Sequence, residues 1–392
     1  MFRKVVDRAK QIRRSERFKH SVATPRRISL HAKQRLNRGV FAIEIKENSG
    51  FFSVMQIVLF ILMFCEEKCL TPQISARGGL YGDAEGRVDW FAAFFEPVHA
   101  AAALPHTRKL RTSTVRDLVQ LGFRQRYEHL LELDSASELF FAYYRPAGHV
   151  MREVDAICED LHIGASTLGA HFRGTDKSLE AMPVSWKDFC RHVEATLADN
   201  PHLTHVFVSS DEAGFLDYFA AWPFGKPVSV APARLLACGA TPIHFSGFPG
   251  LDMGREALIS SLLLSRYGYL VKTPSYLSAW SRIFNPALSV KLVAPPRPDA
   301  FWFPDSRLWL EQQAREGAAC CPPSQGAFRW RTARVSTDSR PGIMWCPVFP
   351  VLGKRAARCR RLQDHARRRR RRLCARGRRA AEPLLHACAE RL

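Results

Sequence analysis

The sequence predicts an α/β protein made of two lobes with a cleft between them. Short apolar runs alternate with longer segments of helical periodicity, and this alternation occurs separately in the two halves of the chain. The 392 residues are enough for two domains, and 46% hydrophobic with 24% charged residues is typical of globular proteins. Clefts between lobes are common places for ligand sites, so the architecture favours a binding or catalytic protein.

The first lobe, residues 39–148, begins with a strand–loop–helix–strand unit. A polar loop that ends in a glycine separates an apolar strand from a long apolar helix. The expected elements are, in order, a strand at 39–45, a loop at 46–50, a helix at 51–68, a strand at 71–75, a glycine-rich loop at 78–82, an aromatic segment at 89–95, helical periodicity over 110–138 and a linker at 145–148.

The second lobe, residues 149–316, repeats the alternation of strands and helices. Its strands are short apolar runs, and polar residues follow several of them directly. The expected elements are a helix at 149–162, a strand at 168–172, a helix at 186–200, a strand at 204–209, a helix at 215–221, a strand at 227–230, a helix at 255–267, a strand at 269–272 and a helix at 277–283.

The basic charge of the chain is concentrated in two tails. Of the net charge of +21, residues 1–38 carry +11 and residues 353–392 carry +12, which leaves −2 for the remainder. The tails either contact a membrane surface or a polyanion such as nucleic acid, or are simply solvated. Residues 317–392 lack apolar periodicity, and one hypothesis is that this Arg-rich tail is an out-of-frame reading of GC-rich DNA.

Cysteine usage and hydropathy favour a cytoplasmic protein, with peripheral membrane contact as one possible use of the tails. The eleven cysteines include no C-x-x-C pair, which indicates incidental thiols rather than a disulfide framework or a zinc site. The apolar run at 51–65 is shorter than the roughly 20 residues that span a bilayer. We therefore expect it to form a buried helix.

The most informative segment is LGAHFRGTDK at 168–177. Its apolar start predicts the end of a buried strand, and polar groups follow at once. Open α/β sheets build their ligand sites at such strand ends. Arg173 and Lys177 place two cations beside this strand end, which suits a diphosphate.

Together with two later blocks, this segment resembles the α-1,6-fucosyltransferase and nodulation-fucosyltransferase family. The family signature, H-x-R-R-T-D-K after a strand, stands here as His171-Phe-Arg-Gly-Thr-Asp-Lys177. A strand that ends in two acids matches at 206–212, and a helix, a strand and a T-x-S loop match at 256–275. The SGFF segment at 49–52 is similar to the family's glycine loop before an apolar helix.

The resemblance covers about residues 39–300 and implies a GT-B fold of two Rossmann-like lobes, with the acceptor on the first and the nucleotide sugar on the second. It also implies inverting transfer of fucose from GDP-fucose to a glycan hydroxyl, without a metal or another cofactor. Arg173 would neutralise the departing diphosphate, and Glu180 would be the base, tuned by Lys177. The implied substrate-binding residues are Gly50, Phe51, His171, Asp211, Glu212, Ser260, Thr273 and Ser275.

Three positions depart from the family pattern. Gly174 replaces the second arginine of the signature, and Ser260 occupies the place of an aspartate that helps recognise guanine. The family's glutamate base comes one residue after Glu180, where this chain has Ala181. The first two departures support a second hypothesis, a degenerate relative that binds a nucleotide or glycan without turnover.

Each candidate residue also has a structural interpretation. Arg173 could be an ion-pair partner, and His171 a packed histidine at a strand end. Asp211, Glu212, Thr273 and Ser275 precede predicted helices and could be caps. A third hypothesis, a nucleic-acid-binding protein, depends on the two tails alone.

Overall fold

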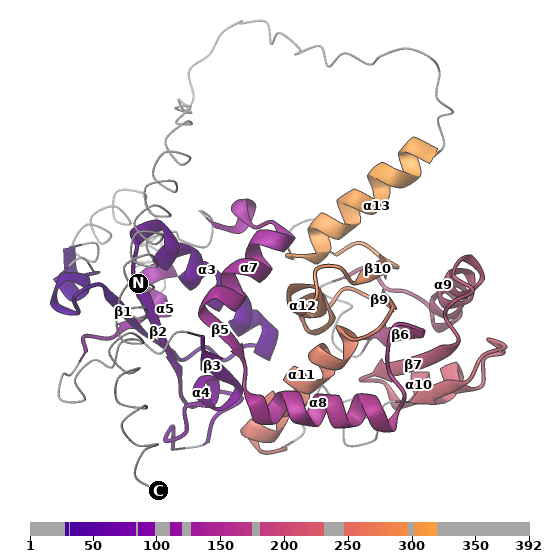
Figure 1. Cartoon of the computed structure of the whole chain (residues 1–392), viewed down its shortest axis with the longest axis horizontal. Helices are drawn as coiled ribbons and strands as arrows, with labels where there is room; N and C mark the ends of the chain where they lie inside the picture. Colours follow the sequence, from indigo (N-terminus) through magenta and orange to yellow (C-terminus); the bar gives the residue numbers. More distant parts are fainter. Residues whose placement is uncertain are drawn as a thin grey trace, which may run out of the picture. The chain divides into compact units, whose positions relative to one another are not determined.

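The computed structural model describes residues 28–30, 32–83, 85–98, 110–119, 127–174, 181–230, 247–296 and 302–319. All of them lie in one compact unit of the chain. They form two sheets of parallel strands with helices packed against them, which confirms the prediction of an α/β fold (Figure 1). Most of the predicted N-terminal arm and the tail from residue 320 onward, including the hypothesis of a changed reading frame, lie outside the described residues.

The first sheet is built from the predicted strand–loop–helix–strand unit. Strand β1 (Val40–Ile45) lies between β2 (Thr71–Ala76) and the short β4 (Ser113–Thr114), and both pairings are parallel. Pro72 is tolerated in β2 because this strand is at the edge of the sheet, where a missing N–H breaks no ladder. Helix α3 (Phe51–Lys68) connects β1 to β2.

Helix α3 is a core helix, as its apolar sequence predicted. Twelve of its residues are buried, including Val54, Val58 and Ile61 with no exposed surface. Its C-cap residue, Cys69, has a left-handed backbone, which lets the N–H groups of Cys69 and Leu70 bond back to the carbonyls of Glu66 and Cys65 in the last turn. In the part of the chain described here, no helix is both long and apolar enough to cross a membrane.

The helical periodicity predicted over 110–138 is confirmed only in part, and the linker predicted at 145–148 is wrong. The described part of this region contains β4, α5 (Val115–Val119), the 3-10 turn η1 (Glu128–Leu130) and α7 (Leu133–Tyr143). Sheet pairing overrides the local periodicity, because Ser113 and Thr114 are held beside β1. The supposed linker instead forms β5 (Tyr144–Pro146), which pairs antiparallel with β3 (Phe95–Pro97) directly after α4 (Trp90–Phe94).

The second sheet has five parallel strands in the order β10-β9-β6-β7-β8. The central strand β6 is buried at all six positions, as expected for a strand covered on both faces. The elements of this region are α8 (Gly148–Asp160), β6 (Thr167–Phe172), α9 (Trp186–Asp199), β7 (His205–Ser210), α10 (Ala213–Ala220), β8 (Val228–Val230), α11 (Gly250–Leu264), β9 (Tyr269–Lys272), α12 (Tyr276–Phe284), β10 (Ser289–Leu292) and α13 (Asp305–Ala319). The last strand and helix were not predicted.

Helices cover both faces of this second sheet. Helices α9 and α10 pack on one face around Phe189 and Phe215, and α11 and α12 contribute to the larger core cluster on the other, with Phe207 and Trp280 (Figure 1). Gly169 in β6 has to be a glycine, because a Cβ there would lie 2.0 Å from the ring of Tyr267. The bare strand backbone therefore lets this aromatic ring lie directly on the sheet.

One apolar cluster contains residues from both predicted lobes. It joins α3 and α7 of the first half to α11 and α12 of the second, for example through Phe52 and Trp280, whose ring centroids lie 5.7 Å apart. The division at residue 148 and the cleft between the lobes stay predictions.

The prediction of incidental thiols throughout is wrong at one position. Cys65, Cys158 and Cys190 are free thiols. Cys69 takes part in a disulfide instead. Spacing alone did not reveal this, because the sequence shows which cysteines exist but not which of them meet in space.

Candidate functional site

The carboxyl edge of the second sheet brings six of the predicted site residues together. In the parallel register His171 of β6 pairs with Lys272 of β9 and with Ser209 of β7, so the three strands end at the same level. Parallel strands deliver the loops that follow them to one edge of the sheet, where open α/β proteins bind ligands. The predicted residues found at this edge are His171, Arg173, Asp211, Glu212, Thr273 and Ser275.

Arg173 is held at this edge by both neighbouring loops. Its backbone N–H donates to Oγ1 of Thr273 at 2.9 Å, and its Nε lies 3.4 Å from Oδ2 of Asp211. The side chains of Arg173 and Asp211 are only 12% and 14% exposed. A partly buried guanidinium fixed in this way is a preorganised cation. Arg173 is also an ion-pair partner of Asp211, which is the structural role that the sequence offered as an alternative.

Glu212 occupies the space next to Gly174, where the resembling family has its second arginine. A Cβ at position 174 would lie 2.0 Å from Oε1 of Glu212, so a larger residue there would have to displace this carboxylate. Glu212 is anchored by Trp186, whose indole Nε1 donates to Oε2 at 3.0 Å. Compared with the family pattern, position 174 therefore lacks a cation, and the carboxylate of Glu212 occupies the space beside it.

His171 is a neutral, buried imidazole. It is 6% exposed, and no described group forms a hydrogen bond with its Nδ1. Burial, together with the charges of Lys272 and Arg173, lowers the pKa of His171 to about 3. An uncharged ring at a strand end can orient a ligand or a loop, but it adds no positive charge for a phosphate.

Lys272 and Asp305 form a buried ion pair that the sequence analysis did not identify. The Nζ of Lys272 lies 2.6 Å from each carboxylate oxygen of Asp305, and the two side chains are 0% and 1% exposed. Burial lowers the pKa of Lys272, against the attraction of Asp305. A lysine at the end of an otherwise apolar strand and the Pro-Asp step before a helix were the available signals.

Phe51 packs into an aromatic cluster of the core. Its side chain is 2% exposed, and its ring lies 5.3 Å from that of Tyr81 and 5.4 Å from that of Trp90. The backbone N–H of Phe51 donates to the hydroxyl of Tyr81 at 2.7 Å. Of the predicted glycine loop, Ser49 and Gly50, the N-cap residue of α3, keep some exposed surface, whereas Phe51 and Phe52 are buried.

Tyr81 accepts the hydrogen bond at this helix start and was also missed. Burial raises the pKa of its phenol, while the hydrogen bond from the Phe51 N–H and then the charge of Arg173 lower it. A single tyrosine in a glycine-rich loop gives no sequence signal for this role.

The remaining predicted residues are not brought to the edge by any described contact. Ser260 lies in the middle of α11, half-buried, and its hydroxyl forms no hydrogen bond with a described residue. Lys177 and Glu180, the predicted catalytic pair, lie outside the described residues. Within the described ranges, no cluster of three or more His, Cys, Asp or Glu side chains has the arrangement of a metal site.

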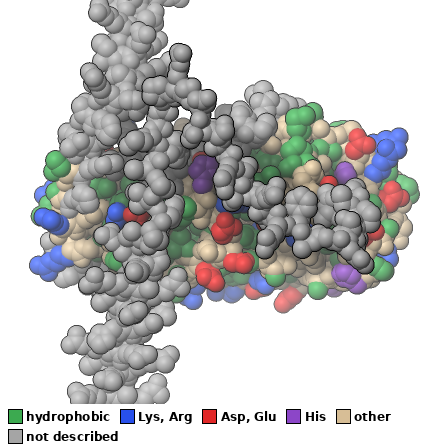
Figure 2. All heavy atoms as spheres, turned by 90° about the horizontal axis from the view of Figure 1, so that it is seen from above, with side chains coloured by type: hydrophobic (Ala, Val, Ile, Leu, Met, Phe, Trp, Pro, Cys, Tyr) green, Lys and Arg blue, Asp and Glu red, His purple; other side chains and the backbone are tan. Residues whose placement is uncertain are grey.

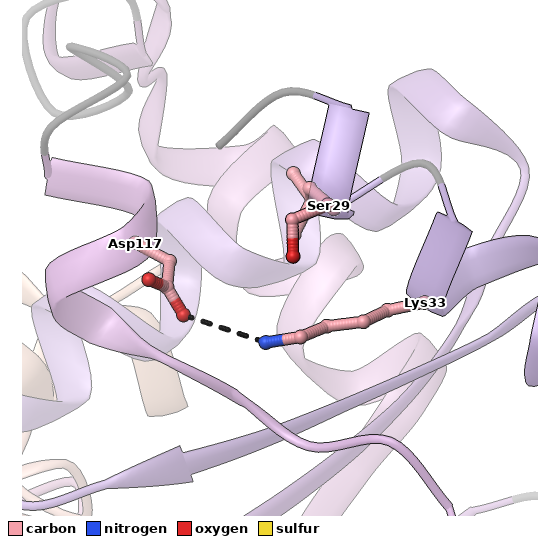
Figure 3. Close-up of a pocket in the computed structure, with 4 residues that line it drawn as sticks. Ser29, Lys33 and Asp117 are labelled. Atoms are coloured by element: carbon pink, nitrogen blue, oxygen red, sulfur yellow. Dashed lines mark ion pairs between the residues drawn. The ribbon is translucent and has the colours of Figure 1, made fainter. Parts of the chain in front are cut away.

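A small cavity of about 30 Å³ lies away from the sheet edge, between the N-terminal helical residues and α5. It is lined by Ser29, Leu30, Lys33 and Asp117, and the Nζ of Lys33 lies 3.8 Å from Oδ2 of Asp117 (Figure 3). This volume is about that of one water molecule. The cavity is too small for a nucleotide or a sugar.

On the face shown in Figure 2, the described side chains that are visible include acidic, basic and hydrophobic ones interspersed with one another. The chain between its two basic tails carries a nearly neutral charge.

The fold and this edge define an α/β protein with a polar site at the carboxyl ends of parallel strands. No family model matches the chain, and no curated protein matches it. Among solved structures, the chain is similar to the NodZ α-1,6-fucosyltransferase co-crystallised with GDP, with 20% identity, coverage of 62% of this chain and 92% of that one, and a TM-score of 0.43. NodZ from Bradyrhizobium gives 19% identity, the same coverage and a TM-score of 0.43.

Two further structures are similar over a comparable length. FUT1 from Arabidopsis thaliana, in complex with GDP, gives 12% identity over 70% of this chain and 76% of that one, with a TM-score of 0.38. Apo POFUT1 gives 10% identity over 65% of this chain and 98% of that one, also with a TM-score of 0.38.

Proposed function

We propose that this protein is a glycosyltransferase that takes fucose from GDP-fucose and transfers it to a glycan hydroxyl with inversion. The observation that supports this most is the assembly of the H-x-R motif with the other two motif blocks at one sheet edge. Arg173, from the first block, contacts Asp211 of the second and Thr273 of the third. Three segments far apart in the sequence therefore meet at one sheet edge.

In the proposed reaction the acceptor oxygen attacks C1 of fucose as the bond from C1 to the diphosphate oxygen breaks. The bonding electron pair leaves with the diphosphate, and the acceptor proton passes to Glu180, beside Lys177. Arg173 stabilises the charge that develops on the diphosphate, and Ser275 donates to the β-phosphate. In this proposal side chains stabilise the charge on the diphosphate, and no metal ion or further cofactor takes part.

The other proposed contacts surround this centre. His171, neutral as described, faces the base or ribose of the nucleotide, and Ser260 faces guanine. Gly50 allows the nucleotide to approach the backbone before α3. Asp211 orients Arg173, and Glu212 lies toward the acceptor.

A second candidate function is a relative that binds a nucleotide or glycan without turnover. The observation in its favour is the Glu212 carboxylate beside Gly174, where the family has a cation. Among the described charged groups at this edge, Arg173 and Lys272 face the three carboxylates of Asp211, Glu212 and Asp305. An acidic balance weakens binding of a diphosphate and slows its departure.

The test is calorimetry with GDP and GDP-fucose, combined with an assay of donor turnover. We expect GDP to bind, and Arg173→Ala to reduce transfer by about 10²–10³-fold. Arg191→Ala is the matched control, because Arg191 is a 59%-exposed arginine of the same region, paired only with Asp188. Binding without turnover of GDP-fucose would select the second candidate, and wild-type turnover in Arg173→Ala would remove Arg173 from the mechanism.

The tails define a third outcome. Absence of GDP binding, together with salt-sensitive binding to any polyanion, would favour a role in nucleic-acid or membrane-surface contact. Removal of residues 353–392 would then make the dependence of log affinity on log salt concentration less steep.

A further inference from the structure

The Lys272–Asp305 ion pair lies directly under the candidate site, yet it has no part in the proposed reaction. Both side chains are shielded from solvent, and both carboxylate oxygens contact the ammonium. Burying two charges costs several kcal/mol per ion, and well-packed apolar residues of similar volume usually stabilise a fold as well or better. Stability alone is therefore a poor explanation for this pair.

The pair also fixes the loop that follows β9. Oδ2 of Asp305 accepts a hydrogen bond from the backbone N–H of Ser275 at 3.2 Å, so the first residue of α13 holds this loop. Lys272, which holds Asp305, is the last residue of β9 and leads into the same loop. The carboxylate therefore connects the end of the strand to the third residue after it.

The same loop then holds the strand that carries Arg173. The backbone N–H of Thr273 donates to the carbonyl of His171 at 3.1 Å, and Oγ1 of Thr273 accepts from the N–H of Arg173 at 2.9 Å. A continuous set of bonds thus runs from Asp305 through residues 272–275 to the backbone of Arg173. Displacing the carboxylate would disturb every member of this set.

We propose that Lys272 and Asp305 are positioning residues, which fix residues 273–275 so that Ser275 and Arg173 together face the diphosphate of a bound nucleotide. This inference rests on the proposed function and adds the groups that hold its phosphate site in place. Neither side chain touches the ligand. Lys272 sets the position of the carboxylate, and the carboxylate sets the position of the Ser275 backbone.

Two variants separate this role from a merely structural one. The double variant Lys272→Met with Asp305→Leu replaces the buried pair by apolar residues and removes the acceptor of the Ser275 N–H. Asp305→Asn keeps an acceptor oxygen at the same place, and its amide can donate to a neutral Lys272 amine. Melting temperatures of both variants report whether the fold is retained.

Two measurements are made on each variant and on the wild type. Native-state amide exchange reports whether the Ser275 N–H is protected, and calorimetry reports affinity for GDP. We expect the double variant to exchange faster at Ser275 and to bind GDP about tenfold more weakly, with Asp305→Asn within about threefold of the wild type in both.

Two results would overturn the inference. The first is unchanged Ser275 exchange in the double variant, because the pair would then not hold the loop. The second is faster exchange with unchanged GDP affinity, because the loop would then not face the diphosphate. If the wild type does not bind GDP, the proposed function fails and the ligand named here fails with it. The amide-exchange measurement at Ser275 still decides by itself whether the Lys272–Asp305 pair holds the loop at 273–275.

Discussion

The start of α3 and the carboxyl edge of the second sheet occupy equivalent positions in two parallel sheets, but they are filled in opposite ways. After β1 the chain places Phe51 in an aromatic cluster, with its backbone N–H bonded to Tyr81. After β6 it places a guanidinium and an imidazole against the charged ends of β7 and β9. A strand end in an α/β sheet thus serves as core or as a polar site according to the side chains it carries.

The two positions differ in what is buried there, and this difference distinguishes the polar site from the core. At the first position the buried groups are apolar and are explained by packing alone. At the second, buried charges are partnered with one another and with loop backbone, which packing alone does not require. The cost of burying those charges marks the second edge, and not the first, as the place to look for function.

The largest expected effect is on the apolar side of the comparison. Phe51→Ala removes a ring that contacts Phe52, Tyr81 and Trp90, and we expect the free energy of unfolding to fall by about 3–5 kcal/mol, independently of pH. Urea denaturation at two pH values measures this. Phe141→Ala, at a 37%-exposed position, is the control. A cost below about 1 kcal/mol would show that the start of α3 is not a packed core.

A similar but pH-dependent loss is expected at the polar edge. Asp305→Ala leaves the Lys272 ammonium buried without its partner, which costs about 3 kcal/mol near neutral pH. Because burial lowers the pKa of Lys272, the unfolded state binds the proton more readily, and the variant regains stability as pH rises toward 10.5. Urea denaturation between pH 7 and 10 tests this. A loss that does not change with pH would show that the lysine charge is not the cause.

The effect at His171 is absent near neutral pH and grows continuously as the pH falls. Its pKa of about 3 in the folded state lies below the usual 6.5, so between these values the unfolded state binds more protons and stability falls as the pH falls. The limiting slope for one group is about 1.4 kcal/mol per pH unit. Subtracting the pH profile of His171→Gln from that of the wild type isolates this contribution. Parallel profiles would mean that the ring is not buried in its neutral form.

The smallest effect is expected at α11. Ser260→Asp adds a carboxylate that can accept both guanine N–H donors, and we expect GDP to bind about tenfold more tightly by calorimetry. Ser260→Ala should stay within about twofold of the wild type. Unchanged affinity in Ser260→Asp would place the guanine contact on another residue.

Much of the framework could be predicted from local pattern. The helix at 51–68 was predicted with the bounds that it has, and the strands of the second sheet, apart from β10, were predicted to within a residue. These elements have uniform apolar runs bounded by polar or glycine residues, so their pattern and their tertiary role agree. Within 110–138 the helical prediction is wrong at Ser113 and Thr114, because these two residues pair with β1 as a short edge strand.

The sequence by itself determined the α/β alternation and the types of residue that follow each strand. Only the tertiary structure decided which strands are neighbours, and so which loops meet. Arg173 and Asp211 are 38 positions apart and Lys272 and Asp305 are 33 apart, yet each pair is in contact. For Arg173 and Asp211 the reason is that parallel pairing aligns the ends of β6 and β7, and for Lys272 and Asp305 it is that the start of α13 packs against the end of β9. Periodicity reports only which face of its own element a residue occupies.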